Sequence, residues 1–502
     1  MDFLNFFQND LKVIFPELFL TITICFILVY GVIYNSTDDS GNTIRYNVSS
    51  EVNWLSILII MITVLLIMNN PINNILIFKN TLVIDNFTSF VKIVVLLSTI
   101  AVILISLNYT KQEKINAFEY PILILLAVTG MLLITSSYDL ISMYLAIELQ
   151  SLSLYVLAAF KRNSELSTEA GLKYFILGAF SSGLLLFGSS LIYGFTGSTN
   201  FGDFALISAG MDLSLISASS GLVIGIIFVS AGLLFKVAAV PFHMWAPDVY
   251  EGSPTSITAF FAIVPKIAIL AVFIRLLFFS FYDIITYWQE ILILCSLMSM
   301  VVGAFGALYQ KNIKRFLAYS GIGHIGYILI GLITGTVYGI SSLLFYMIVY
   351  IIMTLNAFTI VLSLRKNNET NEEIKDITDF QALAKLNPLL SIILALNLFS
   401  MAGVPPLAGF FSKYHLFAAA IESSLYLVAI IGVLTSVVAA FYYIRIIKIM
   451  YFEDNAQPIV IETIDQEKAI ILGISTFFLI FLFLYPSVLL TATHKIALTL
   501  CL

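Results

Sequence analysis

The chain has few charged residues for its length. Asp, Glu, Lys and Arg make up only 11% of its 502 residues, against roughly 25% in an ordinary soluble domain. So few charges cannot cover the surfaces of the roughly three soluble domains that this length would otherwise suggest. With 60% hydrophobic residues, the composition predicts an integral membrane protein. The net charge of −6 and the lack of a basic tract argue against a nucleic-acid partner.

Cysteine and histidine are also scarce, which argues against several kinds of cofactor site. The three cysteines lie far apart and form no CxxC motif: Cys25, Cys295 and Cys501. This spacing argues against a disulfide framework and against an iron–sulfur cluster. The histidines provide no paired-histidine helix for stacked haems; they are His243, His324, His415 and His494. We therefore expect no cofactor or metal in this chain.

Long apolar runs dominate the sequence instead. A helical crossing needs about 20 mostly apolar residues, and a scan on that basis predicts an all-α membrane protein with about fourteen transmembrane helices. The predicted spans are 14–34, 54–74, 87–108, 118–137, 139–160, 168–195, 216–248, 256–281, 285–308, 315–334, 337–364, 387–420, 424–450 and 468–492. The N-terminal stretch MDFLNFFQND has neither the basic region of a signal peptide nor the composition of a transit peptide. We therefore expect the chain to enter its membrane through its own spans.

The basic residues predict the orientation of these spans, because Lys and Arg concentrate on the cytoplasmic or matrix side. The far side has little beyond Lys12, Lys79 and Lys495. The ends of the odd-numbered spans carry Arg45, Lys111, Lys114, Lys161, Arg162, Lys311, Lys314, Arg315, Arg365, Lys366, Lys375, Lys385, Arg445 and Lys448. Both termini are therefore predicted to face away from the cytoplasm or matrix.

Several ionisable residues lie inside the predicted spans, where a charge costs about 2.5–3.5 kcal/mol at the bilayer centre. They are Glu148, Lys173, Lys236, His243, Lys266, His324 and Lys413. Four of them, Glu148, Lys236, Lys266 and Lys413, lie too deep to reach water by extending along the helix. We interpret these four as functional groups that are paired, hydrated or shifted in pKa.

Other ionisable residues have structural explanations that remain open. Lys173 lies near the start of its span and could extend toward the basic side. His324 could be a neutral core histidine. His415 and Arg275 are interpreted as residues at the membrane interface.

Two of the spans contain helix-breaking residues. Pro241 interrupts the seventh span, and Gly403, Pro405, Pro406 and Gly409 interrupt the twelfth. Proline removes a backbone donor and clashes with the preceding turn. Each break has a lysine nearby, and the freed backbone groups are tolerated only beside water or buried protein. We therefore expect a hydrated cavity in which such a lysine exchanges a proton.

Interrupted helices in corresponding places indicate an inverted-repeat transporter. The expected repeats are spans four to eight, at residues 118–282, and spans nine to thirteen, at residues 283–452. Three helices in residues 1–117 would precede these repeats, and one helix in residues 453–502 would follow them.

Four stretches of the sequence carry a resemblance to a known family. They are YLAIELQSLSLYVLAAFKRNSELSTEAGLKYFILGAFSSGLLLFGSSLIYG, FKVAAVPFHMWAPDVYEGSPTSITAFFAIVPKIAI, KRFLAYSGIGHIGYILIG and FSMAGVPPLAGFFSKYHLF. Together they resemble the antiporter-like subunits of respiratory complex I, most strongly over residues 118–450. The resemblance implies a proton-translocating membrane-arm subunit with fourteen helices and two inverted five-helix repeats.

The resemblance also implies roles for individual residues. Glu148 matches a fifth-helix glutamate that pairs with the broken-helix lysine, here Lys236, and Lys173 matches a sixth-helix lysine. The remaining matches are an eighth-helix lysine that links the half-channels, a tenth-helix bridging position and a twelfth-helix terminal lysine, which are Lys266, His324 and Lys413. We expect Glu148, Lys236, Lys266, His324 and Lys413 to form a membrane-parallel row with waters between neighbours. His243 is a possible accessory residue.

The leading interpretation is a complex I subunit whose proton movement is coupled to NADH:quinone oxidoreduction elsewhere in the complex. The alternative is a subunit of a related multisubunit cation/proton antiporter. The implied partners are other membrane-arm subunits, including other antiporter-like chains, and lipids. FMN, iron–sulfur clusters, NADH and ubiquinone would bind to partner subunits. Heavy use of Phe, Ile, Asn and Tyr is typical of an AT-biased organellar genome, which favours the mitochondrial inner membrane, with both termini on the intermembrane-space side, over a bacterial plasma membrane.

Overall fold

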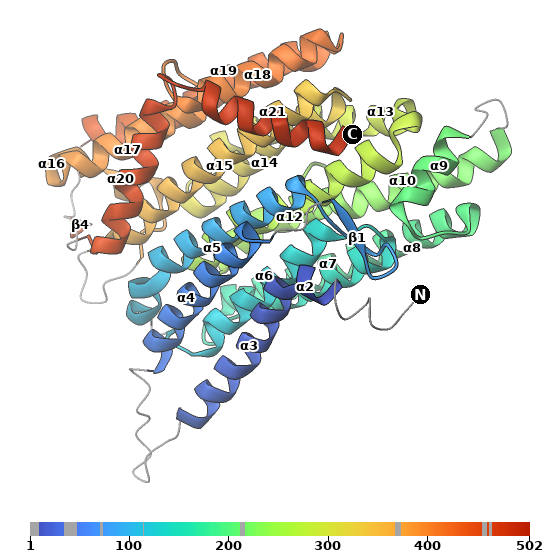
Figure 1. The fold of residues 1–502 in the computed structure, drawn as a ribbon. Helices are drawn as coiled ribbons and strands as arrows, with labels where there is room; N and C mark the ends of the chain where they lie inside the picture. The colour runs from blue at the N-terminus through green and yellow to red at the C-terminus, as the bar shows by residue number, and fades with distance from the viewer. Residues whose placement is uncertain are drawn as a thin grey trace. The chain divides into compact units, whose positions relative to one another are not determined.

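The computed structural model describes residues 10–34, 48–70, 74–113, 115–210, 216–366, 373–453, 459–460 and 464–501. In this part of the chain, twelve helices are long and apolar enough to cross a membrane, and shorter apolar helices accompany them (Figure 1). The predicted all-α membrane fold is therefore confirmed. Backbone contacts divide the chain into two compact units. The first unit comprises Met1–Val237, Gly252–Trp288 and Thr499–Leu502, and the second comprises Ala238–Glu251 and Gln289–Leu498.

The first unit is a helical bundle with a short antiparallel hairpin. Its elements are α2 (Leu11–Val13), α3 (Phe15–Tyr34), α4 (Val48–Met68), β1 (Ile75–Ile77), β2 (Leu82–Ile84), α5 (Asn86–Gln112), α6 (Glu119–Ser136), α7 (Leu140–Ala158), α8 (Glu165–Thr196), α9 (Phe201–Ala209), α10 (Ile216–Val237), α12 (Thr255–Ile274), the π-helical η2 (Arg275–Ser280) and the 3₁₀ turn η3 (Tyr282–Ile284). Polar caps fix where some of these helices begin. Asp85 and Thr88 form a reciprocal capping box at α5, and Asp139 caps α7.

Close helix packing in the first unit depends on glycine. A Cβ on Gly188 of α8 would lie 2.7 Å from the Gly225 carbonyl oxygen of α10, so only glycine lets these two backbones approach so closely. Helix α12 is buried along its whole length and packs against α5 and α6. This buried helix carries Lys266, which gives that lysine a protein environment rather than lipid.

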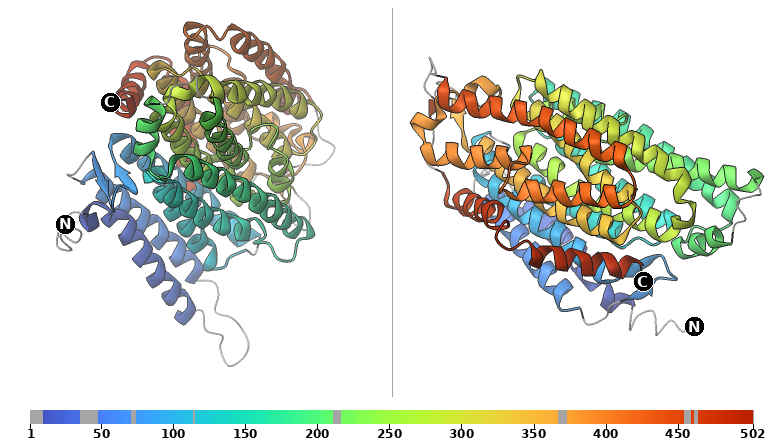
Figure 2. Two further views of the ribbon diagram at one scale, coloured as in Figure 1. Left: turned by 90° about the vertical axis from the view of Figure 1, so that its right-hand side faces the viewer. Right: turned by 90° about the horizontal axis from the view of Figure 1, so that it is seen from above.

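The second unit contains α13 (Ile285–Leu308, which begins in the first unit) and the chain that follows it. The further elements are α11 (Trp245–Gly252), α14 (Ile313–Ile333), α15 (Val337–Ser363), β3 (Arg365–Lys366), the 3₁₀ turn η4 (Ile377–Phe380), α16 (Leu383–Leu386), α17 (Pro388–Ala402), α18 (Ala408–Glu422), α19 (Tyr426–Phe452), β4 (Ile459–Val460), α20 (Gln466–Phe481) and α21 (Ser487–Cys501). Helix α15 packs against α14, α17, α18 and α20 (Figure 2). Its side chains therefore reach most of the helices around it.

Both predicted helix breaks are confirmed. Helix α10 ends at Val237 and α11 begins at Trp245, while α17 ends at Ala402 and α18 begins at Ala408. Each break contains a residue with positive φ, Ala238 in the first and Gly403 in the second. The peptide bonds preceding Pro241 and Pro406 are cis.

Two predicted spans have different bounds in the structure. The second span was placed at 54–74, but α4 runs from Val48 to Met68 and the chain then forms the β1–β2 hairpin. The last span was placed at 468–492, but it is divided between α20 and α21. Pro486 lies between these helices, where it removes a donor and disfavours helical geometry in the residue before it. Parts of residues 35–52 and 366–385, which lie between predicted spans, are outside the described residues, as are Arg45 and Lys114.

Candidate functional site

The second helix break leaves two backbone carbonyls that accept hydrogen bonds from the Lys413 ammonium. Helix α17 ends in the carbonyls of Met401 and Ala402, and in a continuous helix these would accept from the N–H groups four residues later. Those positions are Pro405 and Pro406, which have no N–H. The Lys413 ammonium takes their place, donating to the Met401 oxygen at 3.0 Å and to the Ala402 oxygen at 2.9 Å. A cation is also favourable here because the C-terminus of a helix is its negative end.

Glycine and serine shape the backbone around this lysine. Gly403 has a φ of +90°, and a Cβ there would meet the Lys413 side chain at 3.1 Å. A Cβ on Gly409 would overlap with the backbone carbonyl of Ser400. The Ser400 hydroxyl in turn accepts from the Gly409 N–H at 3.1 Å. The glycines therefore let the start of α18 lie close against the end of α17.

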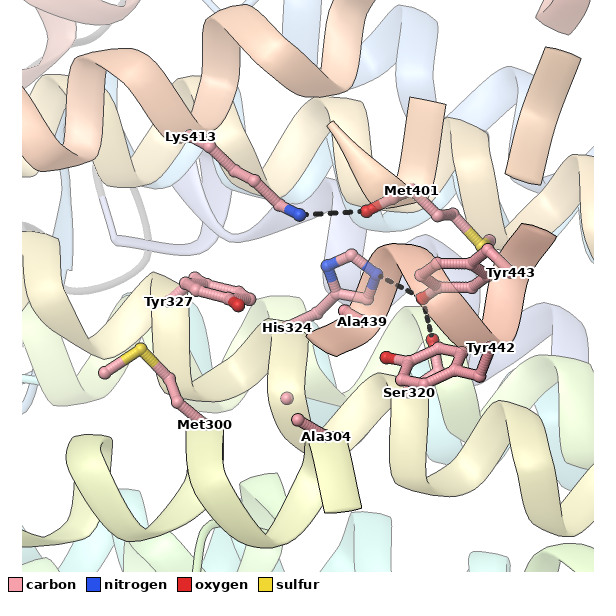
Figure 3. Close-up of a pocket in the computed structure, with 11 residues that line it drawn as sticks. Met300, Ala304, Ser320, His324, Tyr327, Met401, Lys413, Ala439, Tyr442 and Tyr443 are labelled. Atoms are coloured by element: carbon pink, nitrogen blue, oxygen red, sulfur yellow. Dashed lines mark hydrogen bonds between the residues drawn. The ribbon is translucent and has the colours of Figure 1, made fainter. Parts of the chain in front are cut away.

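A small cavity adjoins both Lys413 and His324 (Figure 3). Its volume is about 10 Å³, roughly the space that one water molecule needs. The Tyr327 ring forms another part of its wall, with its centroid 5.0 Å from the Lys413 nitrogen, within the range of a cation–π contact. Lys413 is 5% exposed and His324 is 3% exposed. The cavity therefore has two titratable side chains around a space of water size.

His324 is held by hydroxyl groups on both sides of its ring. Its Nδ1 lies 2.7 Å from the Tyr346 hydroxyl, and its Nε2 lies 3.3 Å from the Tyr443 hydroxyl. The Tyr443 hydroxyl also lies 2.6 Å from the Ser320 hydroxyl. Sequence reasoning left open that His324 is a neutral core histidine. Both ring nitrogens have hydroxyl partners, an arrangement that a neutral imidazole satisfies with one donor and one acceptor nitrogen.

In the first unit, Lys236 lies at the end of α10, where the first break begins. It is 7% exposed, and its ammonium donates to the Tyr155 hydroxyl at 3.3 Å. Glu148 lies seven residues before Tyr155 on α7, which places the two on one helix face. The described residues contain no direct Lys236–Glu148 ion pair, so this pair stays a prediction. Gly178 makes room for the tyrosine, because a Cβ there would overlap with the Tyr155 hydroxyl.

The other predicted residues of the first unit differ in exposure. Lys266 is 4% exposed on α12, directly after Pro265, which lies inside that helix. The Lys173 side chain is 43% exposed and forms an ion pair with Glu169 at 2.8 Å. The position of Lys173 is therefore compatible with the alternative of a lysine that extends to the surface.

Two further histidines of the second unit lie at helix breaks, one within the first break and one on the helix that follows the second break. His243 follows Pro241, and its Nδ1 is buried without a hydrogen-bond partner among the described residues. His415 is half-buried on α18, and its Nδ1 lies 2.9 Å from the Tyr338 hydroxyl. His415 therefore belongs to a second histidine–tyrosine contact, distinct from that of His324.

Sequence reasoning missed two buried ion pairs in the first unit. Lys92 of α5 donates to Glu17 of α3 at 2.6 Å, and both side chains are almost fully buried. Arg275 donates to Asp85 at 2.7 Å and is likewise buried, so it is more than an interfacial anchor. A signal for the first pair existed: Glu17 and Lys92 have opposite charges, and each lies a few residues into a span predicted to enter from the same side.

The sequence of this chain matches a known protein family and individual relatives. A family model described as NADH:quinone oxidoreductase/Mrp antiporter, transmembrane, matches residues 137–439. The chain belongs to this family. It is 52% identical over 500 residues to NADH-ubiquinone oxidoreductase chain 2 of Marchantia polymorpha, covering 99% of this chain and 100% of the relative. It is 47% identical to NADH-quinone oxidoreductase subunit N of Pelagibacter ubique, covering 97% and 99%.

Solved structures agree with this family. A chain of respiratory complex I from Thermus thermophilus superposes with a TM-score of 0.77 at 27% identity, covering 95% of this chain and 98% of the other. The resemblance to antiporter-like complex I subunits is therefore confirmed. Within this family, the two relatives are named as chain 2 of a mitochondrial-type enzyme and subunit N of a bacterial one, so the chain is similar to these particular subunits.

Proposed function

We propose that this chain is a proton-translocating subunit in the membrane arm of an NADH:quinone oxidoreductase. The observation that carries the proposal is the position of Lys413, held on carbonyls that the proline break has freed and facing a water-sized cavity shared with His324. A buried lysine in a membrane helix is costly unless it has a function. Here the fold provides both the acceptors that hold its charge and a neighbour for its proton.

The residues suggest how a proton is held and moved. The Met401 and Ala402 carbonyls and the Tyr327 ring stabilise the ammonium form of Lys413. None of these groups can take the proton, so it leaves toward the cavity, where His324 is the titratable neighbour. Lysine suits this role because its protonation can change, whereas arginine stays charged.

The first unit contributes a second set of groups to the proposed relay. Lys236, Glu148 and Lys266 are the members, and the Tyr155 hydroxyl bonded to Lys236 belongs beside them. We propose that these residues, with His324 and Lys413, form the membrane-parallel row expected from the sequence. Lys173 and His243 are proposed as accessory groups. The helices at 118–282 and 283–452 are proposed as the two inverted repeats, between the segments 1–117 and 453–502.

The proposed partners are other membrane-arm subunits and the surrounding lipids. Electron transfer would take place on FMN and iron–sulfur clusters in partner subunits that act on NADH and ubiquinone. Among the described residues, no group of three or more His, Cys, Asp or Glu could hold a metal ion. We propose the mitochondrial inner membrane as the location, with both termini on the intermembrane-space side.

The alternative is a subunit of a multisubunit cation/proton antiporter, which the family description also includes. Both functions would use buried lysines, so the site alone does not separate them. Co-purification does: the proposal expects the chain to purify with subunits that carry flavin and iron–sulfur clusters. A stable complex that lacks redox subunits and exchanges cations for protons would favour the alternative.

Substitution of Lys413 tests the proposed site directly. In an assembled complex reconstituted into liposomes, Lys413→Met should reduce proton translocation through this chain by about 10²-fold or more, as expected for the loss of a positioned proton-transfer group. The measured quantity is protons translocated per NADH oxidised. Lys448→Met is the matched control, because the Lys448 side chain is 66% exposed at the end of α19. A normal proton yield from an assembled Lys413→Met complex would disprove the proposal.

A further inference from the structure

Four side chains form a continuous hydrogen-bonded chain through His324. They come from three helices: Ser320 and His324 from α14, Tyr346 from α15 and Tyr443 from α19. The links are Ser320 to Tyr443 at 2.6 Å, Tyr443 to His324 Nε2 at 3.3 Å, and His324 Nδ1 to Tyr346 at 2.7 Å. All four side chains are almost fully buried. Such a chain of hydroxyls and an imidazole is the kind of path along which protons move.

The three hydrogen bonds through His324 can all run in either of two donor-to-acceptor directions. A neutral imidazole has one donor and one acceptor nitrogen, and each hydroxyl has one proton to donate. Three hydroxyls and one ring N–H supply four protons for three hydrogen bonds. One proton is therefore left over, on the Ser320 hydroxyl in one direction and on the Tyr346 hydroxyl in the other. Among the described residues, neither of these end hydroxyls has another hydrogen-bond partner. Passage of one proton through the chain converts one direction into the other.

The two ends of the chain have different surroundings. Ser320 and Tyr443 line the cavity that Lys413 also lines, whereas Tyr346 does not (Figure 3). The two ring nitrogens of His324 therefore serve different sides. Nε2 contacts Tyr443, which lines the cavity, and Nδ1 contacts Tyr346, which does not line it.

We propose that Tyr443 and Tyr346 are proton-transferring residues, one on each side of His324, and that Ser320 completes the link to the cavity. The inference rests on the proposed function and extends it to groups other than lysine and histidine. Lys413 releases a proton to a water in the cavity, and Tyr443 accepts a proton there while giving its own to Nε2. Nδ1 then gives its proton to Tyr346, which passes its own to a water outside this cavity. The number of protons is conserved, and no oxidant or reductant takes part.

The test replaces each tyrosine by phenylalanine, which keeps the ring and removes only the hydroxyl. In assembled complexes, Tyr443→Phe and Tyr346→Phe should each reduce proton translocation by about 10²-fold and change the solvent deuterium isotope effect on the coupled rate. Tyr338→Phe is the matched control: it lies on the same helix as Tyr346 and also loses a tyrosine–histidine hydrogen bond, the one to His415. The control should keep the normal rate and isotope effect.

The outcomes separate this inference from the proposed function. If Lys413→Met and His324→Gln abolish translocation while both phenylalanine variants are normal, the inference is wrong and the proposed function stands. If all four variants are normal, the proposed function fails as well. If a phenylalanine variant does not assemble, infrared difference spectra of the unmodified protein with isotope-labelled tyrosine decide the question. The inference requires a change in the tyrosine C–OH band during turnover, and its absence would overturn the inference.

Discussion

Proline and lysine act together at the second helix break. Pro405 and Pro406 remove the two N–H groups that would occupy the Met401 and Ala402 carbonyls, and Lys413 donates to those same carbonyls. A membrane protein must satisfy such groups internally, because the bilayer core has no water to bond them. The break and the charge therefore stabilise each other, and neither is well explained without its partner.

The buried ion pair between Lys92 and Glu17 lies outside the proposed relay and is expected to affect stability. Lys92 and Glu17 form a close ion pair whose second carboxylate oxygen, Glu17 Oε2, is buried without a partner among the described residues. Such a pair contributes little net stability, but the loss of one member leaves an uncompensated buried charge. The pair is thus expected to be sensitive to single substitutions and tolerant of paired ones.

Lys92→Met should lower the free energy of unfolding of the chain by about 3–5 kcal/mol. Adding Glu17→Gln should restore most of this loss, because the orphaned carboxylate becomes neutral. The measurement is denaturant unfolding in detergent, with Lys448→Met, which breaks an exposed ion pair with Glu453, as a control worth about 0–1 kcal/mol. A double variant as unstable as the single one would show that packing, rather than charge, explains the effect.

The sequence predicted individual residues unequally well, for physical reasons. Lys236, Lys266, His324 and Lys413 were recognisable because a titratable group deep in an apolar span is unusual. Tyr155, Tyr346 and Tyr443 gave no such signal, since tyrosine is common in membrane helices and its hydroxyl partner depends on tertiary packing. Glu17 and Lys92 were overlooked because each lies near a span end, where a charge attracts little attention.

At the scale of elements, the broken helices were predictable, but some helix ends were not. Paired prolines and flanking glycines in an apolar run leave little alternative to an interruption, and the structure confirms both breaks. The early start of α4 was not predicted, because polar and apolar residues alternate at that end. The division between α20 and α21 was also missed, although Pro486 inside the last predicted span was a signal for it. The β1–β2 hairpin was also missed; its short strands pack Ile77, Leu82 and Ile84 with Val13, a contact that a scan for long apolar runs does not detect.

Substitution of the two prolines should remove the second helix break while Lys413 is kept. Replacing both Pro405 and Pro406 with alanine restores two N–H donors, so α17 and α18 can join and the Met401 and Ala402 carbonyls return to helical bonds. We expect an assembled complex whose proton translocation falls about as far as that of Lys413→Met. The measurement is protons translocated per NADH.

Pro388→Ala provides the matched control for this change. Pro388 occupies the first turn of α17, where its missing N–H would have no partner in any case. Removing that proline should therefore leave proton translocation unchanged. Normal translocation by the Pro405→Ala/Pro406→Ala variant would show that Lys413 functions without the freed carbonyls.

On the scale of the whole molecule, each compact unit contains buried ionisable groups beside a helix break. The first unit holds Lys236 and Lys266, with the half-buried Glu148, and the second holds His324 and Lys413. Two arrangements are compatible with this distribution. Each unit could translocate protons by its own route, or the two sets could act one after the other along a single route, as the proposed row requires.

A double variant distinguishes these arrangements. If Lys236 and Lys413 act in series, either Lys236→Met or Lys413→Met stops the route, and combining them reduces proton translocation no further, as expected for residues that act as a unit. If the routes are independent, each single variant keeps the flow through the other unit, and only the double variant loses both, with effects that add. We expect the series result, because a charge crossing the low-dielectric interior needs every intermediate holding point, and the loss of one restores most of the barrier. The measurement is protons translocated per NADH for the two single variants and their combination, with Lys413→Met/Lys448→Met as the control for a second lysine substitution. Substantial translocation by both single variants, lost only in the Lys236→Met/Lys413→Met double variant, would replace the single row with two separate routes.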